Sequence, residues 1–313
     1  IEYIKERKSN WASETLNENI RIFDLLAEFV NHKQVHTITR KDMRRVRDQV
    51  LRIPKNYVKY EKFRGMSVSD AIEADNGNTP VSLKTASKSW NTMKSFMSWV
   101  IKTNHLDPML IEDLVIKDKA DLKKKRDPFS LDELQTWFSC PIYTGCHSMR
   151  FRTKPGIHII KDVLYWTPLI ALYSGMRLAE IIQMEIDDVN KEKNIWIFDI
   201  NLNSKNGIVK SIKNNSPRKV PVHKELINMN FIEFIKDRKK NGNIRIFDEI
   251  KRSKNESSEK GNYSDLFSRK FAQCLQQLKL KRPELVFHSF RHNTTDALRR
   301  AGVSDVDRKD IIG

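Results

Sequence analysis

The sequence predicts a mainly α-helical protein of the α+β class, with a helical N-terminal domain and a mostly helical second domain around a small antiparallel β-sheet. Three observations support this prediction. Apolar residues recur at helical spacing through most of the chain, strand-like alternation appears only after Asn190, and a highly charged run interrupts the apolar pattern. The 313 residues are enough for two ordinary domains with cores of their own.

The N-terminal third is predicted to be helical. Thr15 and Glu18 have the spacing of a capping box and precede apolar residues at helical spacing up to Val30. Thr39 can cap a second helix, whose apolar side carries Met43, Val46 and Val50.

A further helix is predicted from about Ser82 to Lys102. Its apolar stripe consists of Trp90, Met93, Met97 and Val100, and a different side carries Lys84, Lys88, Asn91 and Ser95. A basic, amide-bearing face of this kind can sit in a DNA groove. It can equally be an ordinary solvated face, and the helix alone favours that interpretation. The charge of the whole chain makes the two alternatives equal.

A domain boundary is predicted where the apolar pattern disappears. Residues 117–126 read Lys-Asp-Lys-Ala-Asp-Leu-Lys-Lys-Lys-Arg, and Asp127-Pro128 follows. This composition is typical of a linker. We therefore assign residues 1–120 to the N-terminal domain, 121–128 to a basic linker and 129–313 to the second domain.

The second domain begins with helices and then changes period. Thr167-Pro168 is the expected N-cap and first turn of a helix that ends at Gly175, and a second helix follows to about Met184. Strands are predicted at 195–198 and 219–222, and helices at 225–236 and 265–280.

The composition narrows the function. The net charge of +17 indicates a polyanionic partner, with nucleic acid first and an anionic membrane surface second. No apolar run approaches the ~20 residues that span a bilayer. Three cysteines give no disulfide framework and fit a reducing cytosol, so a cytoplasmic protein is expected. Cys140, Cys146 and His147 match no usual zinc spacing, so a structured loop is expected there and no metal.

Three groups of cationic or protonatable residues stand out in the second domain. Arg177 lies at the start of a predicted helix, with Glu180 on the same face. His288 and Arg291 share a face near another helix N-terminus, where free N–H groups favour an anion. Lys213 lies in a turn before the second predicted strand.

Such residues make a phosphate site if they converge. Arginine grips two phosphate oxygens at once, and two arginines can stabilise a five-coordinate phosphorus transition state without a metal. Lysine or histidine can give a proton to the leaving sugar oxygen. Each group alone occurs in many proteins for structural reasons, so the prediction rests on their order, spacing and charge context together.

These residues resemble the two boxes of the tyrosine recombinases of the phage integrase type, above all those of phages and genomic islands. Residues 169–189, with Ser-Gly-Met-Arg-Leu-Ala-Glu at 174–180, resemble the first arginine box. Phe-His-Ser-Phe-Arg-His at 287–292, followed by Ala301-Gly302 and Ile-Ile-Gly at 311–313, resembles the second. Lys213, eight residues before Pro221, matches the catalytic lysine of the family's β-turn. The resemblance covers roughly residues 123–313, and the N-terminal part only in its general character as a helical core-binding (SAM-like) domain.

The resemblance implies a site-specific recombinase or integrase of a mobile genetic element, encoded by a bacterium or phage. It would cut and rejoin double-stranded DNA at attachment sites through a 3′-phosphotyrosine link, without metal, ATP or another cofactor, as a tetramer on DNA. Arg177 and Arg291 would clamp the scissile phosphate with the help of His288. Lys213 would be the general acid, and Glu180 would orient its neighbours. Further candidate DNA contacts are Lys84, Lys88, Asn91, Lys123, Lys124, Lys125 and Arg126.

The family's nucleophilic tyrosine is expected after the second box and beyond Gly313. All seven tyrosines of the chain precede His288. We therefore expect this chain to be inactive for cleavage.

Three alternatives remain: a type IB topoisomerase-like enzyme, a catalytically idle DNA-binding protein of the same fold, and a basic structural or membrane-surface protein. The compact helical N-terminal domain and the integrase-like residue pattern of the two boxes favour a recombinase over a topoisomerase. The presence of Arg177, Lys213, His288 and Arg291 argues against an idle protein. The paired boxes argue against a membrane-surface protein, which would explain only the charge.

Overall fold

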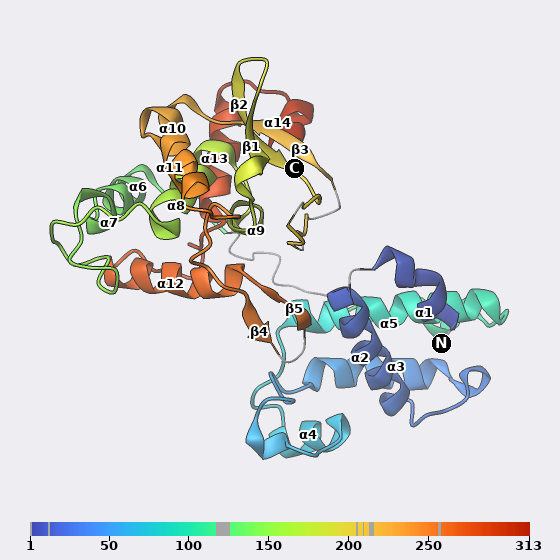
Figure 1. Ribbon diagram of the computed structural model, residues 1–313. Coiled ribbons are helices and arrows are strands. Elements are labelled where there is room, and N and C mark those ends of the chain that lie inside the picture. Colours follow the sequence, from blue (N-terminus) through green and yellow to red (C-terminus); the bar gives the residue numbers. More distant parts are fainter. Residues whose placement is uncertain are drawn as a thin grey trace. The chain divides into compact units, whose positions relative to one another are not determined.

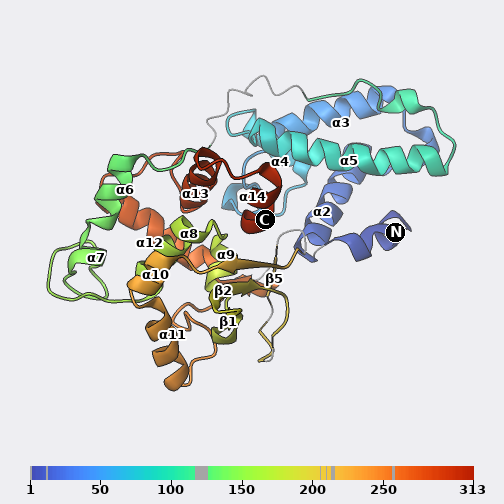
Figure 2. The same ribbon diagram turned by 90° about the horizontal axis from the view of Figure 1, so that it is seen from above.

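The structure is a computed structural model that describes residues 2–11, 13–116, 126–204, 206–208, 210–212, 216–255 and 258–313. The chain divides into two compact units, residues Ile1–Lys123 (unit 1) and Lys124–Gly313 (unit 2), which Figures 1 and 2 show from two directions. Most of the predicted linker lies outside the described residues. Among the described residues, no helix has the length and apolar character to cross a membrane.

Unit 1 is helical, as predicted. Its α-helices are α1 (Glu2–Arg7), α2 (Ser13–Phe29), α3 (Arg40–Arg52), α4 (Val68–Asp75) and α5 (Leu83–Thr103). The apolar sides of α2, α3 and α5 pack together and form the core of the unit. The Trp90 ring of α5 is fully buried, and its indole nitrogen donates a hydrogen bond of 2.8 Å to the Leu114 carbonyl. The bulkiest side chain of this core therefore leaves no polar group unpaired.

Capping residues and apolar stripes in the sequence predicted most of these helices. Thr39 caps α3 in a capping box with Asp42, and the stripe of α5 predicted from the sequence is buried. The expected start of α2 is wrong, because this helix begins at Ser13 rather than after Thr15. Helix ends of this kind commonly vary by one or two residues, since polar residues are tolerated throughout a first turn.

Unit 2 is mostly helical with a small antiparallel sheet, which confirms the predicted fold class. Its helices are α6 (Leu131–Phe138), α7 (Pro141–Thr144), α8 (Val163–Ser174), α9 (Leu178–Ile182), α10 (Lys224–Asn228), α11 (Phe231–Lys240), α12 (Ser264–Gln277), α13 (Ser289–Arg300) and α14 (Asp305–Ile312). The main sheet has the order β1 (Val189–Glu192), β2 (Ile195–Ile200), β3 (Arg218–Pro221). A separate antiparallel hairpin joins β4 (Ser253–Asn255) and β5 (Ser258–Asn262).

Helix α8 is the centre of unit 2 and corrects one prediction. Asp162, not Thr167, caps it, and the Asp162 carboxylate accepts hydrogen bonds from the backbone nitrogens of Leu164 and Tyr165. Pro168 therefore lies inside the helix rather than in its first turn. The helix is apolar on almost every side and packs against α13 and α9 (Figures 1 and 2). Burial of the whole segment outweighs the hydrogen bond that Pro168 removes.

The helix predicted at 225–236 is in fact two helices, α10 and α11. Asn230 separates them with a φ of 66°, a left-handed conformation that asparagine tolerates better than most residues. The apolar pattern continues across the break, because Leu226 and Phe231 are both fully buried. Periodicity alone therefore did not reveal the turn.

Candidate functional site

Arg177 is placed by the turn that joins α8 to α9. Gly175 ends α8 with a φ of 68°, and Arg177 precedes the first residue of α9. The buried carboxylate of Glu180 accepts hydrogen bonds of 2.9 Å from both the backbone nitrogen and Nη1 of Arg177. One carboxylate thus holds Arg177 at its backbone and at its guanidinium.

Arg291 comes from the first turn of α13. Its Nη1 donates to the Gly175 carbonyl at 2.7 Å and to the Ile312 carbonyl at 2.6 Å. Burial, together with the nearby Arg177 and Arg218, lowers the pKa of Arg291 to about 10, so the group keeps its charge at neutral pH. The guanidinium is therefore buried, charged and fixed in direction.

The two arginines meet at one oxygen. Nη2 of Arg177 donates to the Gly313 carbonyl oxygen at 2.6 Å, and Nη2 of Arg291 donates to the same oxygen. The sequence predicted that Arg177 and Arg291 would face one point, and the structure brings them together there. The carbonyl oxygen marks a position that an oxygen of a phosphate could take, because both guanidinium groups already direct N–H bonds to it.

Sequence reasoning missed a third arginine, Arg218, which lies at the start of β3. Its Nη2 and Nη1 bind the two oxygens of Glu180 at 2.7 and 3.1 Å, and its Nε donates to the Ile311 carbonyl at 3.1 Å. Burial alone would raise the pKa of Glu180, but hydrogen bonds from Arg218 and Arg177 outweigh this effect and lower it. The one signal in the sequence was an arginine beside a predicted strand, which is too common to single out.

His288 precedes α13 and is half-buried near Arg177 and Arg291. Burial is the main cause that lowers its pKa to about 4, and the positive charges of Arg291, Arg126 and Arg177 and the ring of His292 add to it. The imidazole is therefore neutral at pH 7. A neutral imidazole can donate one hydrogen bond and accept another.

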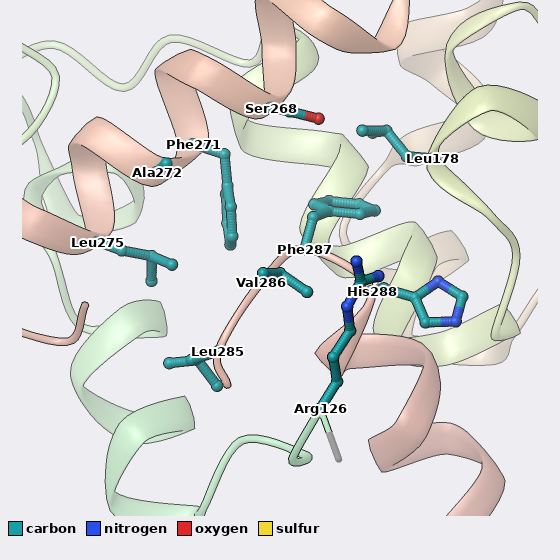
Figure 3. A pocket seen from close by; sticks show the side chains of 10 residues that line it. All are labelled: Arg126, Leu178, Ser268, Phe271, Ala272, Leu275, Leu285, Val286, Phe287 and His288. Atoms are coloured by element: carbon teal, nitrogen blue, oxygen red, sulfur yellow. The ribbon is translucent and has the colours of Figure 1, made fainter. Parts of the chain in front are cut away.

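A pocket of about 330 Å³ opens next to His288 (Figure 3). Arg126 and His288 line one part of it, and the rest of the lining is largely apolar, with Leu178, Ser268, Phe271, Ala272, Leu275, Leu285, Val286 and Phe287. Arg126, one of the predicted DNA contacts, therefore lies close to the predicted catalytic histidine.

Four predicted site residues are not among those that the structure describes. Lys213, Lys123, Lys124 and Lys125 fall outside the described residues. The described lysine nearest to Lys213 in sequence, Lys210, is buried in ion pairs with Asp188 at 2.7 Å and Glu185 at 3.2 Å. These contacts make Lys210 a structural residue of the sheet region.

The predicted polar face of α5 belongs to unit 1. Lys84, Lys88 and Asn91 are all exposed on it, as the spacing predicted. Lys88 forms an ion pair of 2.6 Å with Glu18, so part of its charge is neutralised in this structure.

The cysteine-histidine segment shows no metal site. Cys140 and Cys146 are buried, and the Cys146 thiol donates to the His158 carbonyl at 3.1 Å. Within the described part of the chain, no group of three or more histidine, cysteine, aspartate or glutamate residues is arranged to hold a metal ion.

Comparison with solved structures gives matches over nearly the whole chain. The Tn1549 transposon integrase in complex with circular intermediate DNA is 16% identical, with a TM-score of 0.55 over 100% of this chain and 89% of that one. A lambda integrase dimer bound to a COC′ core site is 14% identical, with a TM-score of 0.57 over 100% of this chain and 72% of that one. The XerH site-specific recombinase in a post-cleavage complex with palindromic difH is 13% identical, with a TM-score of 0.50 over 93% and 87% of the two chains.

At these identities the likeness concerns the fold. No curated protein sequence matches the chain. The sequence model described as the phage integrase family matches residues 160–313, the part that contains Arg177, Glu180, Arg218, His288 and Arg291. Together with the fold of unit 2 and the two boxes, this match shows that the chain carries a domain of the phage integrase family, the tyrosine recombinases.

Proposed function

We propose that this protein is a site-specific DNA recombinase or integrase of a mobile genetic element and that Arg177 and Arg291 bind the scissile phosphate. The observation that carries the proposal is the single oxygen that both guanidinium groups contact. A phosphodiester that displaced the Gly313 carbonyl would present oxygens to both groups. The extra negative charge of a five-coordinate phosphorus would then be stabilised by two fixed cations.

The other residues take supporting roles in this proposal. Glu180 and Arg218 keep Arg177 in place, since Arg218 and Arg177 share the two oxygens of one carboxylate. His288 is neutral before DNA binds and can hydrogen-bond the phosphate or its leaving oxygen. Lys213 is the proposed general acid for the 5′ oxygen, because it lies eight residues before Pro221, as in the family's motif.

The nucleophile completes the proposal. The tyrosine hydroxyl would give up its proton to solvent as its oxygen bonds to the 3′ phosphate. The bond from the same phosphorus to the 5′ oxygen breaks, and the 5′ oxygen takes a proton. All seven tyrosines precede His288, and we propose that the reacting tyrosine follows the second box. No metal, ATP or other cofactor is needed, because the energy of the broken bond is kept in the covalent link.

The rest of the chain would hold DNA. We propose that residues 1–120 form a core-binding domain, joined by the basic linker 121–128 to the catalytic domain 129–313. Lys84, Lys88 and Asn91 on α5, with Lys123 to Arg126, would contact the duplex. Four copies would assemble on an attachment site, in the cytoplasm where such DNA is found. The net charge of +17 supports a polyanionic partner.

The test is a nicked suicide substrate that carries the attachment site, incubated in EDTA with two versions of the protein. The 313-residue chain should bind but form no covalent adduct, and the protein extended through its natural continuation should form an adduct that survives a denaturing gel. Arg291→Ala in the extended protein should abolish or strongly reduce the adduct. An adduct formed by the 313-residue chain would contradict the proposed nucleophile, and an adduct that requires added metal would contradict the proposed mechanism.

A further inference from the structure

Residues 145–162, between α7 and α8, form a long loop, here called an excursion, whose two sides are joined by backbone hydrogen bonds. The backbone nitrogen of Cys146 donates to the His158 carbonyl at 2.8 Å, and that of His158 donates to the Cys146 carbonyl at 3.0 Å. A Cβ added to Gly156 would lie 2.5 Å from the Cys146 carbonyl oxygen. Only glycine fits at that crossing, so the chain path is specified locally.

A buried ion pair holds the inside of this excursion. Arg152 is 2% exposed, pairs with Asp162, and donates to the Ile160 carbonyl at 2.8 Å. Asp162 is also the cap of α8, so the excursion is tied to the central helix of unit 2. Polar contacts therefore fix the segment, and its apolar side chains are not needed to hold it.

Those apolar side chains face solvent. Met149, Phe151, Ile157 and Ile159 are 57%, 39%, 89% and 55% exposed. Single exposed apolar residues are ordinary, but four within one short fixed segment indicate an interaction site. No acidic residue occurs from 145 to 161. Arg150 and Lys154 lie over the Phe151 ring at 5.5 and 4.6 Å, and neither forms an ion pair with a described residue. We call residues 147–161 the basic excursion.

Unit 1 contains a segment that is acidic where the excursion is basic. Residues 106–116 contain Asp107, Glu112 and Asp113 and no lysine or arginine. Met109 and Val115 in the same stretch are 53% and 54% exposed. Glu112 and Asp113 are exposed and form no ion pair with a described residue. We call residues 107–115 the acidic segment.

We propose that the acidic segment of one copy of this chain docks on the basic excursion of a second copy. Both surfaces combine exposed apolar side chains with charges that pair with no described residue. The charges are of opposite sign, which favours contact between the two surfaces and disfavours contact between two identical ones. DNA is the less suitable occupant of the excursion, because four exposed apolar side chains gain little against a phosphate backbone.

This contact would use two different surfaces of each copy. A contact of this kind is heterologous. Each copy can dock its acidic segment on one neighbour and bind the acidic segment of another on its basic excursion. The copies form a closed ring if the rotation between neighbours divides a full turn evenly. The proposal goes beyond the proposed function, because it names the two surfaces through which copies would associate and uses none of the residues at the phosphate site.

The test is sedimentation equilibrium of the 313-residue chain at rising concentration, in low salt and without DNA. One variant combines Glu112→Lys with Asp113→Lys, and the other combines Arg150→Glu with Lys154→Glu. Each variant alone should self-associate more than about tenfold more weakly than the wild type, because like charges would face each other. An equimolar mixture of the two should associate again, because the reversed surfaces are complementary. High salt should weaken the wild-type association.

Controls reverse as many charges elsewhere. Lys224→Glu with Lys240→Glu in unit 2, and Asp24→Lys with Glu73→Lys in unit 1, should leave self-association unchanged, and circular dichroism checks that all variants fold. A wild type that stays monomeric, control variants that act like the test variants, or a mixture that does not associate would each overturn the proposal. So would a basic-excursion variant that loses DNA affinity while it self-associates normally, since that result would assign the excursion to DNA.

Discussion

Glu180 is the residue on which the phosphate site depends most. Its two oxygens bind Arg177 and Arg218, and both arginines also donate to the carbonyls at the end of α14. A single buried carboxylate therefore binds two of the three arginines but neutralises only one positive charge, and the third, Arg291, is held by backbone oxygens. This difference leaves a net positive charge where an anion would bind.

Arg218→Ala should destabilise the protein by about 1–3 kcal/mol, because the buried Glu180 carboxylate would lose one of its two cationic partners. It should also slow DNA cleavage by the extended protein with little loss of DNA affinity, since Arg177 would lose its support rather than its charge. Urea denaturation and single-turnover cleavage measure the two effects. The neighbouring Lys219, whose ion pair with Glu192 is exposed, is the matched control, and Lys219→Ala should leave the free energy of unfolding nearly unchanged. Equal costs at the two positions would contradict the role given to Arg218.

His288 should make stability depend on pH. Its pKa is lowered to about 4 in the folded chain, whereas an unfolded histidine titrates near pH 6.5. Between these values the unfolded chain binds a proton that the folded chain does not, so the free energy of unfolding should fall as the pH drops from about 6.5 to about 4. His288→Gln should remove this component of the pH dependence, measured by denaturation at several pH values. An NMR titration of His288 with a midpoint near 6.5 would refute the prediction.

At the scale of elements, the site is a junction between helix ends. The C-terminal end of α8, the first turn of α13 and the last carbonyls of α14 meet there, and Arg291 donates to carbonyls from two of these ends. Helix C-termini carry partial negative charge, which favours the bound guanidinium groups. The arginines are therefore positioned by backbone groups that packing of the helices brings together.

Gly175→Ala should disturb this junction. The φ of Gly175 is 68°, and an added Cβ would lie 3.4 Å from side-chain atoms of Ile312 and Thr294. We expect a loss of about 1–2 kcal/mol in the free energy of unfolding, from backbone strain and crowding. We also expect the arginines to bind the phosphate more weakly. Gly242 has a similar φ of 77° with nothing within 4 Å, so Gly242→Ala measures the strain alone. A Gly175→Ala variant that cleaves DNA normally would contradict the proposed importance of the junction.

At the scale of the whole molecule, the net positive charge has the largest effect on binding. An excess of 17 positive charges favours DNA over any small substrate and makes binding sensitive to salt. The logarithm of DNA affinity should fall linearly with the logarithm of salt concentration, with a slope near −0.9 for each phosphate neutralised.

Replacing Lys123, Lys124, Lys125 and Arg126 with alanine should make that slope shallower, by up to about 0.9 for each phosphate that the variant no longer neutralises. Fluorescence anisotropy with a labelled duplex at several salt concentrations measures it. Alanine at four exposed lysines of unit 2, namely Lys224, Lys240, Lys279 and Lys281, serves as a control for the change of net charge. An unchanged slope in the linker variant would show that this run does not bind DNA.

The sequence by itself determined the fold class, most helices and both strands flanking the turn, because these follow from local periodicity and capping residues. It also offered Arg177, His288 and Arg291 as candidate site residues, because short motifs contain them. Tertiary structure alone decided what these residues meet. Arg218 binds Glu180 from 38 residues away, Arg291 binds the Gly175 carbonyl from 116 residues away, and Asp162 rather than Thr167 begins α8. Such contacts depend on how helices and strands pack, and packing is set by the whole apolar surface buried in the core. A local pattern can therefore name a charged residue, but only the folded core selects its partner.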